Sequence, residues 1–264
     1  MHNRWLLRHI IFAIFLTISI PSFAQTSTQK NVQTNYQVWI SANTISRISK
    51  KWDVLADFHI RRNEFLNEPG FYFVRFGAQY WLKDNITVAL GYAHMWNAPE
   101  FEDWKTFSNE NRIYQQFQFS HKLNKTSLLF RLRNEQRKIQ IMQADTFSGN
   151  YRNTDRVRIL VSVNFPVFRK PNAPELLIAN EVLMNFGKDV VYNTFDQNRS
   201  TIALKGKINA RWSYDVGYML VFQQKPPGTD YLVNHTLRLF FYGFFNFRKS
   251  KIDSENIQQI SGEE

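Results

Sequence analysis

The sequence has 264 residues and carries 33 Lys and Arg against 22 Asp and Glu, a formal net charge of +11. Cysteine is absent, which excludes disulfides, thiolate metal sites and a lipid-modified N-terminal cysteine. Aromatic residues make up 16% of the chain, yet its mean hydropathy of −0.40 is too polar for an all-helical membrane protein. We expect no bound cofactor.

The first 24 residues have the pattern of a cleaved secretory signal peptide. Two arginines precede an apolar run at 10–20, and Ala24 is a small residue at the expected cleavage point. The run is shorter than the roughly 20 residues of a spanning helix, which disfavours the alternative of an N-terminal membrane anchor. The sequence therefore predicts export. Lipid phosphates or acidic polymers, rather than nucleic acid, are the expected counterparts of the basic charge.

The remaining chain repeats short segments in which apolar and polar residues alternate. In the segment 52–61, Val54 and Phe58 alternate with Asp53 and Asp57. Because successive side chains of a β-strand point to opposite faces, each such segment has one apolar and one polar face. We identify candidate strands at 36–43, 52–61, 72–80, 86–96, 110–121, 127–140, 156–164, 176–186, 199–205, 212–222 and 231–247.

The links between these segments predict an up-and-down arrangement. Short turns are expected at 82–85, 122–126 and 206–211, and long loops at 97–109 and 141–153, as in outer-membrane barrels. The proline-rich link 166–175 falls on the side of the short turns, which carries Lys83, Lys122, Lys125, Arg169, Lys170, Lys207 and Arg211. The opposite side carries Glu100, Glu102, Asp103, Asp145, Asp189 and Asp230. This difference could orient the barrel, or the turns could simply be polar.

The segment 127–140, SLLFRLRNEQRKIQ, shows the alternation most clearly. Arg131, Arg133, Glu135 and Arg137 share one parity, whereas leucine and phenylalanine precede them in the other. On a strand these charges form one row, but on a helix they would be scattered around the cylinder. A soluble sandwich would turn the row toward water. Behind an export signal, repeated two-faced strands instead predict a closed barrel, apolar outside and charged inside.

The fold class we predict is all-β, an antiparallel transmembrane β-barrel of about 10–12 strands with a narrow, charged lumen. Single-chain bacterial barrels use an even number of strands. We therefore expect ten strands, with 36–43 outside the barrel, or twelve, with one strand undetected. The expected division is a signal peptide at 1–24, a flexible segment at 25–34, the barrel at 35–247 and a polar tail at 248–264.

Charged residues of the polar parity are expected to meet inside the barrel. In a narrow lumen, arginine–carboxylate pairs would offset one another's desolvation and fill the interior as a paired network. Because arginines outnumber carboxylates, a second interpretation is an anion-attracting pore or ligand pocket. The candidate residues are Glu110, Arg112, Arg131, Arg133, Glu135, Arg137, Arg156, Arg158, Glu181 and Arg199.

The opposite parity is expected to face lipid. It largely avoids charge, which would cost about 2–4 kcal/mol at the bilayer midplane. His94, Gln115, Asn134 and Asn180 depart from this pattern and are expected mostly near an interface. Aromatic girdles are predicted from Trp52, Tyr80, Trp81, Trp96, Trp212, Tyr214 and Tyr242.

Several motifs resemble one known family. The most specific is R-x-R-x-E-x-R at 131–137, supported by Asn198-Arg199 and by N-E-N-R at 109–112. These residues resemble the domain-of-unknown-function family 2490, whose members are predicted outer-membrane barrels seen widely in Bacteroidetes-like bacteria. The resemblance covers about residues 35–247 and implies a Gram-negative outer-membrane barrel. The family has no established activity, so it transfers no functional residue.

The sequence thus predicts a non-enzymatic protein of the cell outer membrane, either structural or a narrow, porin-like channel that favours anions. Expected partners are outer-membrane lipids, lipopolysaccharide and the barrel-assembly machinery, with no nucleic acid. One alternative is a lipid-modifying hydrolase or acyltransferase that uses His59, His94, His121 or His235, although neither G-x-S-x-G nor H-E-x-x-H occurs. A second alternative is a soluble, lipocalin-like carrier.

Overall fold

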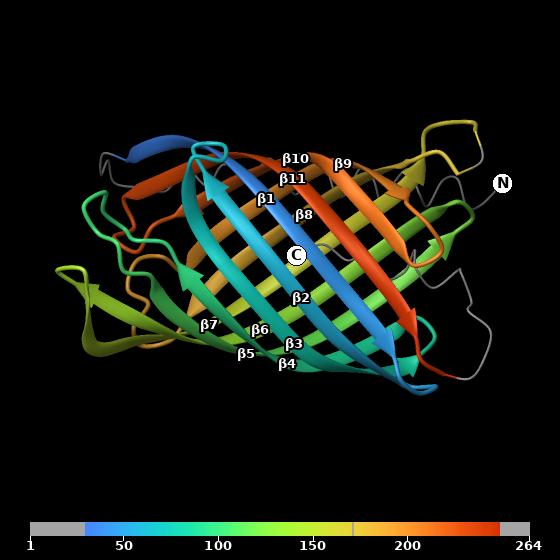
Figure 1. Ribbon diagram of the computed structural model, residues 1–264, viewed down its shortest axis with the longest axis horizontal. Helices are drawn as coiled ribbons and strands as arrows, with labels where there is room; N and C mark the ends of the chain where they lie inside the picture. Colours follow the sequence, from blue (N-terminus) through green and yellow to red (C-terminus); the bar gives the residue numbers. More distant parts are fainter. Residues whose placement is uncertain (1–29, 171, 249–264) are drawn as a thin grey trace. The chain divides into compact units, whose positions relative to one another are not determined.

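The computed structural model describes residues 30–170 and 172–248, and these residues form eleven strands (Figure 1). The strands are β1 (Asn31–Arg47), β2 (Trp52–Asn63), β3 (Glu68–Lys83), β4 (Ile86–Asn97), β5 (Ser108–Leu123), β6 (Thr126–Gln143), β7 (Thr146–Pro166), β8 (Glu175–Phe186), β9 (Phe195–Lys207), β10 (Trp212–Gln224) and β11 (Asp230–Asn246). In these two ranges, no helix has the length and apolar character needed to cross a membrane. The expected signal peptide, 1–24, and the expected tail beyond residue 248 lie outside the described residues.

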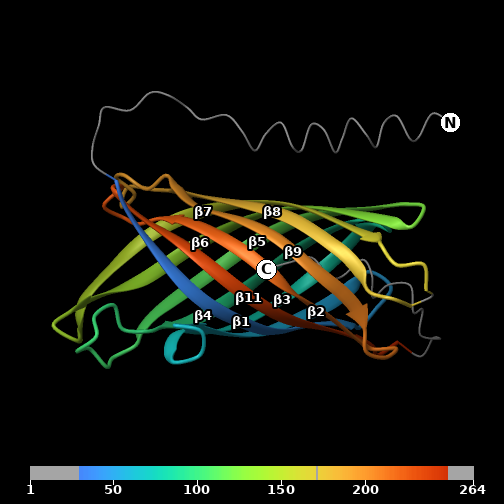
Figure 2. The ribbon, with the colours of Figure 1, turned by 90° about the horizontal axis from the view of Figure 1, so that it is seen from above.

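The strands close into one barrel (Figures 1 and 2). Each strand pairs with the next in antiparallel fashion, and β1 and β11 then pair in parallel. The predicted all-β barrel is confirmed, but the expected count of ten or twelve strands is wrong. All eleven candidate segments are strands. With an odd number in an up-and-down order, the first and last strands point the same way, so closure must be parallel.

Two boundaries differ from the sequence prediction. β1 begins at Asn31, so residues expected to be flexible pair instead with β11, starting at Asp230. The long loop expected at 141–153 is a continuation of β6 and β7. These strands are joined by Ala144 and Asp145, whose φ angles are +47° and +60°. Positive φ at both central residues is the geometry of a tight hairpin turn, here formed without the usual Asn-Gly pair.

The barrel has two different ends. The connections 64–67, 98–107, 144–145, 187–194 and 225–229 lie at one end, which we call the loop end. There the β6–β7 hairpin extends farthest, at the left in Figures 1 and 2. The other end, where β11 terminates, we call the turn end. The strand directions place the predicted basic rim at the turn end and the predicted acidic residues at the loop end.

Alternate residues of the strands are buried inside the barrel or exposed on its outer surface. In β2, Asp53 and Asp57 are buried while Val54 and Phe58 are exposed, as the alternation predicts. Exposed apolar side chains occur on β2 to β11, including Phe76, Leu90, Ile113, Leu132, Ile159, Ile178, Ile202, Val216 and Leu237. The period of two is thus the main determinant of which side chains lie inside.

Two aromatic residues expected in the outer girdles point inward instead. The Tyr242 hydroxyl donates a hydrogen bond of 2.6 Å to Asp215, and the Trp81 indole donates one of 2.6 Å to Asp53. A buried aromatic ring with a polar end needs such a partner, which the interior supplies. Trp52 and Tyr80, by contrast, meet edge to face with ring centroids 4.9 Å apart.

Candidate functional site

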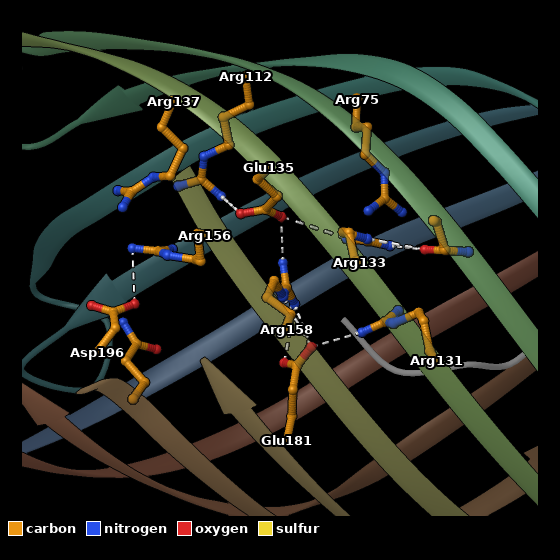
Figure 3. Close-up of polar contacts among 12 residues, drawn as sticks. Arg75, Arg112, Arg131, Arg133, Glu135, Arg137, Arg156, Arg158, Glu181 and Asp196 are labelled. Atoms are coloured by element: carbon orange, nitrogen blue, oxygen red, sulfur yellow. Dashed lines mark hydrogen bonds and ion pairs between the residues drawn. The ribbon is translucent and has the colours of Figure 1, made fainter. Parts of the chain in front are cut away.

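The ten predicted charged residues come together inside the barrel. They lie on the five consecutive strands β5 to β9, and nine of them are buried while Arg137 is half-buried. We call these ten residues, together with Asp196, the ionic network. Figure 3 shows most of its members pointing toward one another inside the barrel.

Glu181 of β8 is a hub of the ionic network. Arg158 donates two hydrogen bonds to its carboxylate, of 2.9 and 3.0 Å. Arg131 and Arg199 donate one each, of 3.0 and 3.2 Å. A planar guanidinium matches a carboxylate in this two-point geometry, and charge-assisted bonds of this kind are among the strongest in proteins. One carboxylate therefore holds three strands, β6, β7 and β9, to β8.

Glu135 of β6 is a second hub. It accepts a hydrogen bond of 2.8 Å from Arg158, which thereby bridges Glu135 and Glu181 (Figure 3). Arg112 donates a longer one of 3.5 Å, and the Arg133 guanidinium lies 3.9 Å away. Because Arg112 belongs to β5 and Arg158 to β7, Glu135 links the strands on both sides of its own.

Glu110 and Asp196 complete the network toward the loop end. Glu110 accepts hydrogen bonds from Arg112 at 2.7 Å and from Arg137 at 2.5 Å. Arg156 forms an ion pair of 2.8 Å with Asp196. Asp196 was not among the predicted residues because β8 and β9 slip in register beside it, which leaves both Asp196 and its neighbour Gln197 buried. A bulge of this kind breaks the alternation on which the prediction relied.

Three further ion pairs line the rest of the barrel interior and were also absent from the predicted set. Arg47 pairs with Asp53, Arg75 with Asp57, and Arg238 with Asp215, the last through hydrogen bonds of 2.7 and 2.9 Å. Asp53, Asp57 and Asp215 share the polar parity of their strands. Their parity alone therefore predicts an inward position, as it does for the charges of β5 to β9.

An apolar layer adjoins the ionic network on the side of the turn end. It contains Leu129, Leu160, Leu177, Ala179 and Ala203, all buried. Elsewhere in the interior, Tyr114 is almost fully buried beside Gly77 and Gly91, where an added Cβ would collide with its ring or hydroxyl. Side chains therefore pack the middle of the barrel.

The histidines considered for catalysis lie in separate places. On the outer surface, His94 contacts the side-chain oxygens of Asn111 and Asn109, at 2.9 and 3.2 Å. His235 contacts the Tyr218 hydroxyl at 2.6 Å. His59 is inside the barrel, against Phe73 and Phe240. No group of three His, Cys, Asp or Glu that could hold a metal ion occurs within 30–170 and 172–248.

Comparison with known proteins identifies one family. The family described as "Protein of unknown function (DUF2490)" matches residues 36–232, a range that starts in β1 and ends in β11. No curated protein and no solved structure matches the chain. The match covers well over half of the sequence and confirms the resemblance carried by the motifs of β5, β6 and β9. The chain therefore belongs to the DUF2490 family of proteins of unknown function.

Proposed function

We propose that this protein is a non-enzymatic, integral β-barrel of the bacterial outer membrane whose packed, ion-paired interior closes it to free diffusion. The observation that carries the proposal is the division of the strands into an apolar outer face and an ionic inner face. A closed barrel leaves no strand edge unpaired, which is the requirement for crossing a bilayer with strands.

The outer surface supports a lipid environment. Large apolar side chains such as Leu90, Ile202 and Leu237 are half or more exposed on it. Soluble monomers rarely expose contiguous apolar patches larger than a few hundred Å². Hydrocarbon around the barrel would remove this apolar surface from water, which is favourable by about 25 cal/mol per Å² of buried area. In the alternative, a soluble, lipocalin-like carrier, these outer apolar side chains would remain exposed to water.

Polar residues that interrupt the apolar outer face bond to one another across strands. Gln115 of β5 and Gln136 of β6 exchange hydrogen bonds of 2.9 and 3.1 Å. Asn180 of β8 and Asn198 of β9 do the same at 3.0 and 3.1 Å. An unpaired amide in hydrocarbon would cost several kcal/mol, so mutual pairing is what a lipid-facing surface requires.

The interior supports a closed barrel. The hubs Glu135 and Glu181 cross-link the strands, and Leu160 and Leu177 of the apolar layer are 1% and 0% exposed. A barrel of this size has an interior that long side chains can fill. A narrow, anion-favouring channel is the second candidate, and the observation in its favour is the excess of arginines over carboxylates in the ionic network.

The rims support an orientation. The turn end, where β11 terminates, would face the periplasm, and its lysines and arginines would meet lipid phosphates. The acidic loop end would face outward, toward lipopolysaccharide. Insertion in this direction would require the barrel-assembly machinery. Neither rim, in this arrangement, would encounter nucleic acid.

The proposal is tested by membrane fractionation and bilayer recording. We expect the protein to stay in the outer-membrane pellet through carbonate and urea washes. It should be released by detergent and should run as a heat-modifiable band. In planar bilayers the closed barrel predicts no discrete conductance. Release by carbonate alone would contradict the membrane assignment, and steady anion-selective steps would favour the channel instead.

The non-enzymatic part of the proposal has a separate test. A hydrolase or acyltransferase would need a nucleophile activated by a neighbouring base. Alanine substitution of His94, His121 and His235, which lie on the outer surface, is expected to leave cellular lipid profiles unchanged. A changed acyl composition in any of these strains would support the enzyme alternative.

A further inference from the structure

The barrel interior holds a cavity of about 710 Å³ at the loop end, which we call the vestibule. Residues of the 98–107 loop, including Glu100 and Trp104, line its mouth, and Arg112, Arg158 and Arg199 of the ionic network line its inner part. Small-molecule sites in proteins commonly occupy roughly 300–1,000 Å³. The vestibule is therefore large enough for a ligand about the size of a disaccharide.

The wall of the vestibule carries a surplus of positive charge. Seven arginines and Lys225 line it, against the carboxylates of Glu100 and Glu110. Their other carboxylate partners, Glu135, Glu181 and Asp196, lie behind the wall. Eight cations thus face five carboxylates, and two of these, Glu135 and Glu181, also pair with arginines outside the wall, so at least three positive charges are in excess. Guanidinium groups keep their proton in proteins, so the surplus cannot be removed by titration.

Two of these arginines have no polar partner in the described part of the chain. No hydrogen bond or ion pair holds the guanidinium of Arg61 or of Arg152, and the Nε atom of each is buried without an acceptor. A buried charged donor without an acceptor is costly. An oxyanion entering the vestibule would supply acceptors for the terminal NH2 groups of both side chains.

Arg61 is held in place by aromatic rings rather than by a carboxylate. Its guanidinium carbon lies 3.2 Å from the centroid of the Trp39 ring and 4.1 Å from that of Phe71. The Arg199 guanidinium lies 5.2 Å from the same Trp39 ring. Stacking fixes the plane of a guanidinium but leaves the N–H groups at its edge available for a two-point contact with an oxyanion.

The other polar residues of the wall are mainly amides. Side-chain amides both donate and accept hydrogen bonds, which suits the hydroxyl groups of a sugar. Trp104, which meets Phe101 edge to face at 4.7 Å, adds an aromatic ring at the mouth. The amides of the wall include Asn35, Asn97, Gln223 and Asn234.

We propose that the vestibule binds an acidic saccharide of about disaccharide size, with its anionic groups on Arg61 and Arg152 and its hydroxyls on the surrounding amides. This inference goes beyond the proposed function, because a closed barrel requires no ligand. The ligand proposal can fail while the membrane proposal holds, because binding is measured on the purified protein in detergent and does not depend on where the barrel resides in the cell.

Isothermal titration calorimetry on the full chain in detergent micelles tests the proposal. The probe is a disaccharide that contains a uronate and a sulfate, with maltose and inorganic sulfate as comparisons. We expect the acidic disaccharide to bind, and both comparisons to bind at least about 10-fold more weakly, because each offers only part of the contacts. Affinity should fall as salt is raised. No binding of the acidic disaccharide overturns the proposal. Equal binding of sulfate overturns the saccharide assignment.

Variants locate the site. Arg61→Gln and Arg152→Gln are each expected to weaken binding by about 10-fold or more, since each removes a charge-assisted contact. Lys83→Gln removes the same charge at the turn end, away from the vestibule, and should bind as the wild type does. Arg61→Lys keeps the charge without the planar edge and should bind more weakly than wild type. Unchanged affinity in variants that keep their heat-modifiable mobility would overturn the proposal.

Discussion

At the scale of single residues, the interior is governed by an asymmetry between losing one partner of an ion pair and losing both. Breaking a buried pair leaves a charge uncompensated and costs about 3–5 kcal/mol, whereas replacing both partners with apolar groups is often nearly neutral. The effect should be largest at Glu181, because the loss of this one carboxylate would remove an ion-pair partner from Arg131, Arg158 and Arg199 together. The pairing of strands gives the barrel its shape. Carboxylates such as Glu181 determine which substitutions of the buried arginines the interior can accept without a large loss of stability.

We expect Glu181→Gln to lower the free energy of unfolding by about 3–5 kcal/mol, because three buried guanidiniums lose their shared counter-charge. Urea unfolding in lipid vesicles, followed by tryptophan fluorescence, measures the change. The matched control is Glu102→Gln on the exposed 98–107 loop, for which the expected change is within about 0.5 kcal/mol. A loss no larger than that of the control would show that Glu181 is not the hub.

The Arg238–Asp215 pair gives a second residue-scale prediction. Arg238→Met or Asp215→Leu alone should each destabilise the barrel by about 3–5 kcal/mol, because each leaves the other charge buried. The double variant should recover most of that loss, since it removes both charges at similar volume. The same unfolding measurement checks this double-mutant cycle. Additive losses would mean that the two side chains are stabilised independently.

At the scale of elements, the β6–β7 hairpin and the 98–107 loop form a unit at the loop end. The backbone N–H groups of Thr106 and Lys105 donate hydrogen bonds of 2.7 and 3.0 Å to the Asp145 carboxylate at the hairpin tip. The bond from Thr106, and after it that from Lys105, lowers the pKa of Asp145 below its ordinary value. The hairpin thus holds the loop that forms the mouth of the vestibule.

This contact predicts a pH dependence confined to the loop. Because the pKa of Asp145 is depressed, its contribution is complete above the ordinary aspartate pKa of about 3.9 and is lost as pH falls through the lowered value. Amide hydrogen exchange at Lys105 and Thr106 should therefore quicken, relative to other loop amides, in that acidic range. Asp145→Gly, which tolerates the positive φ and removes the acceptor oxygens, should exchange quickly at every pH. Equal protection in the variant would contradict the contact.

How far the sequence predicted the structure differs between elements. In β5 to β9 the alternation is unbroken around the charges, so all ten candidate residues were placed on the correct face. Asp196 was missed because a register slip sets it outside the alternation. The β6–β7 extension was mistaken for a loop because Ala144-Asp145 lacks the usual turn residues.

The sequence did not show which side chains contact one another inside the barrel. Periodicity states which face a side chain occupies, but not which strand lies opposite it across the barrel. Arg131 and Glu181 are 50 residues apart in the sequence and meet because their strands, β6 and β8, lie on either side of β7. Arg61 shares the polar parity of Asp53 and Asp57, yet nothing local indicates that it has Trp39 and Phe71 as neighbours and no carboxylate.

At the scale of the whole molecule, closure by a parallel pair distinguishes this barrel from the even-numbered ones. The β1–β11 pairing is continuous from Asn31 with Asp230 to Arg47 with Asn246. Parallel ladders are slightly less stable per residue than antiparallel ones. The length of the β1–β11 pairing, which we call the seam, therefore adds to its stability. The division into outer and inner faces, and with it the vestibule, follows from this register, because a slip of one residue would exchange the two faces.

Cysteine cross-linking tests the seam. Because the native chain has no cysteine, only an introduced pair can form a disulfide. Ile40→Cys combined with Leu239→Cys joins residues paired in the register, and we expect oxidation to produce a faster band on non-reducing gels. Ile40→Cys combined with Phe241→Cys, offset by two residues, should cross-link poorly. The reverse preference would place β1 and β11 in another register.

The proposed membrane barrel requires that alternate residues of each strand meet two different environments, hydrocarbon outside and packed side chains inside. Nuclear Overhauser measurements on methyl-labelled protein in lipid nanodiscs test it most directly. Leu90, Ile202 and Leu237 should show cross-peaks to lipid acyl chains, whereas Leu160 and Leu177 should show none. Acyl-chain contacts to Leu160 and Leu177, or water contacts in place of lipid at Leu90, Ile202 and Leu237, would contradict the account.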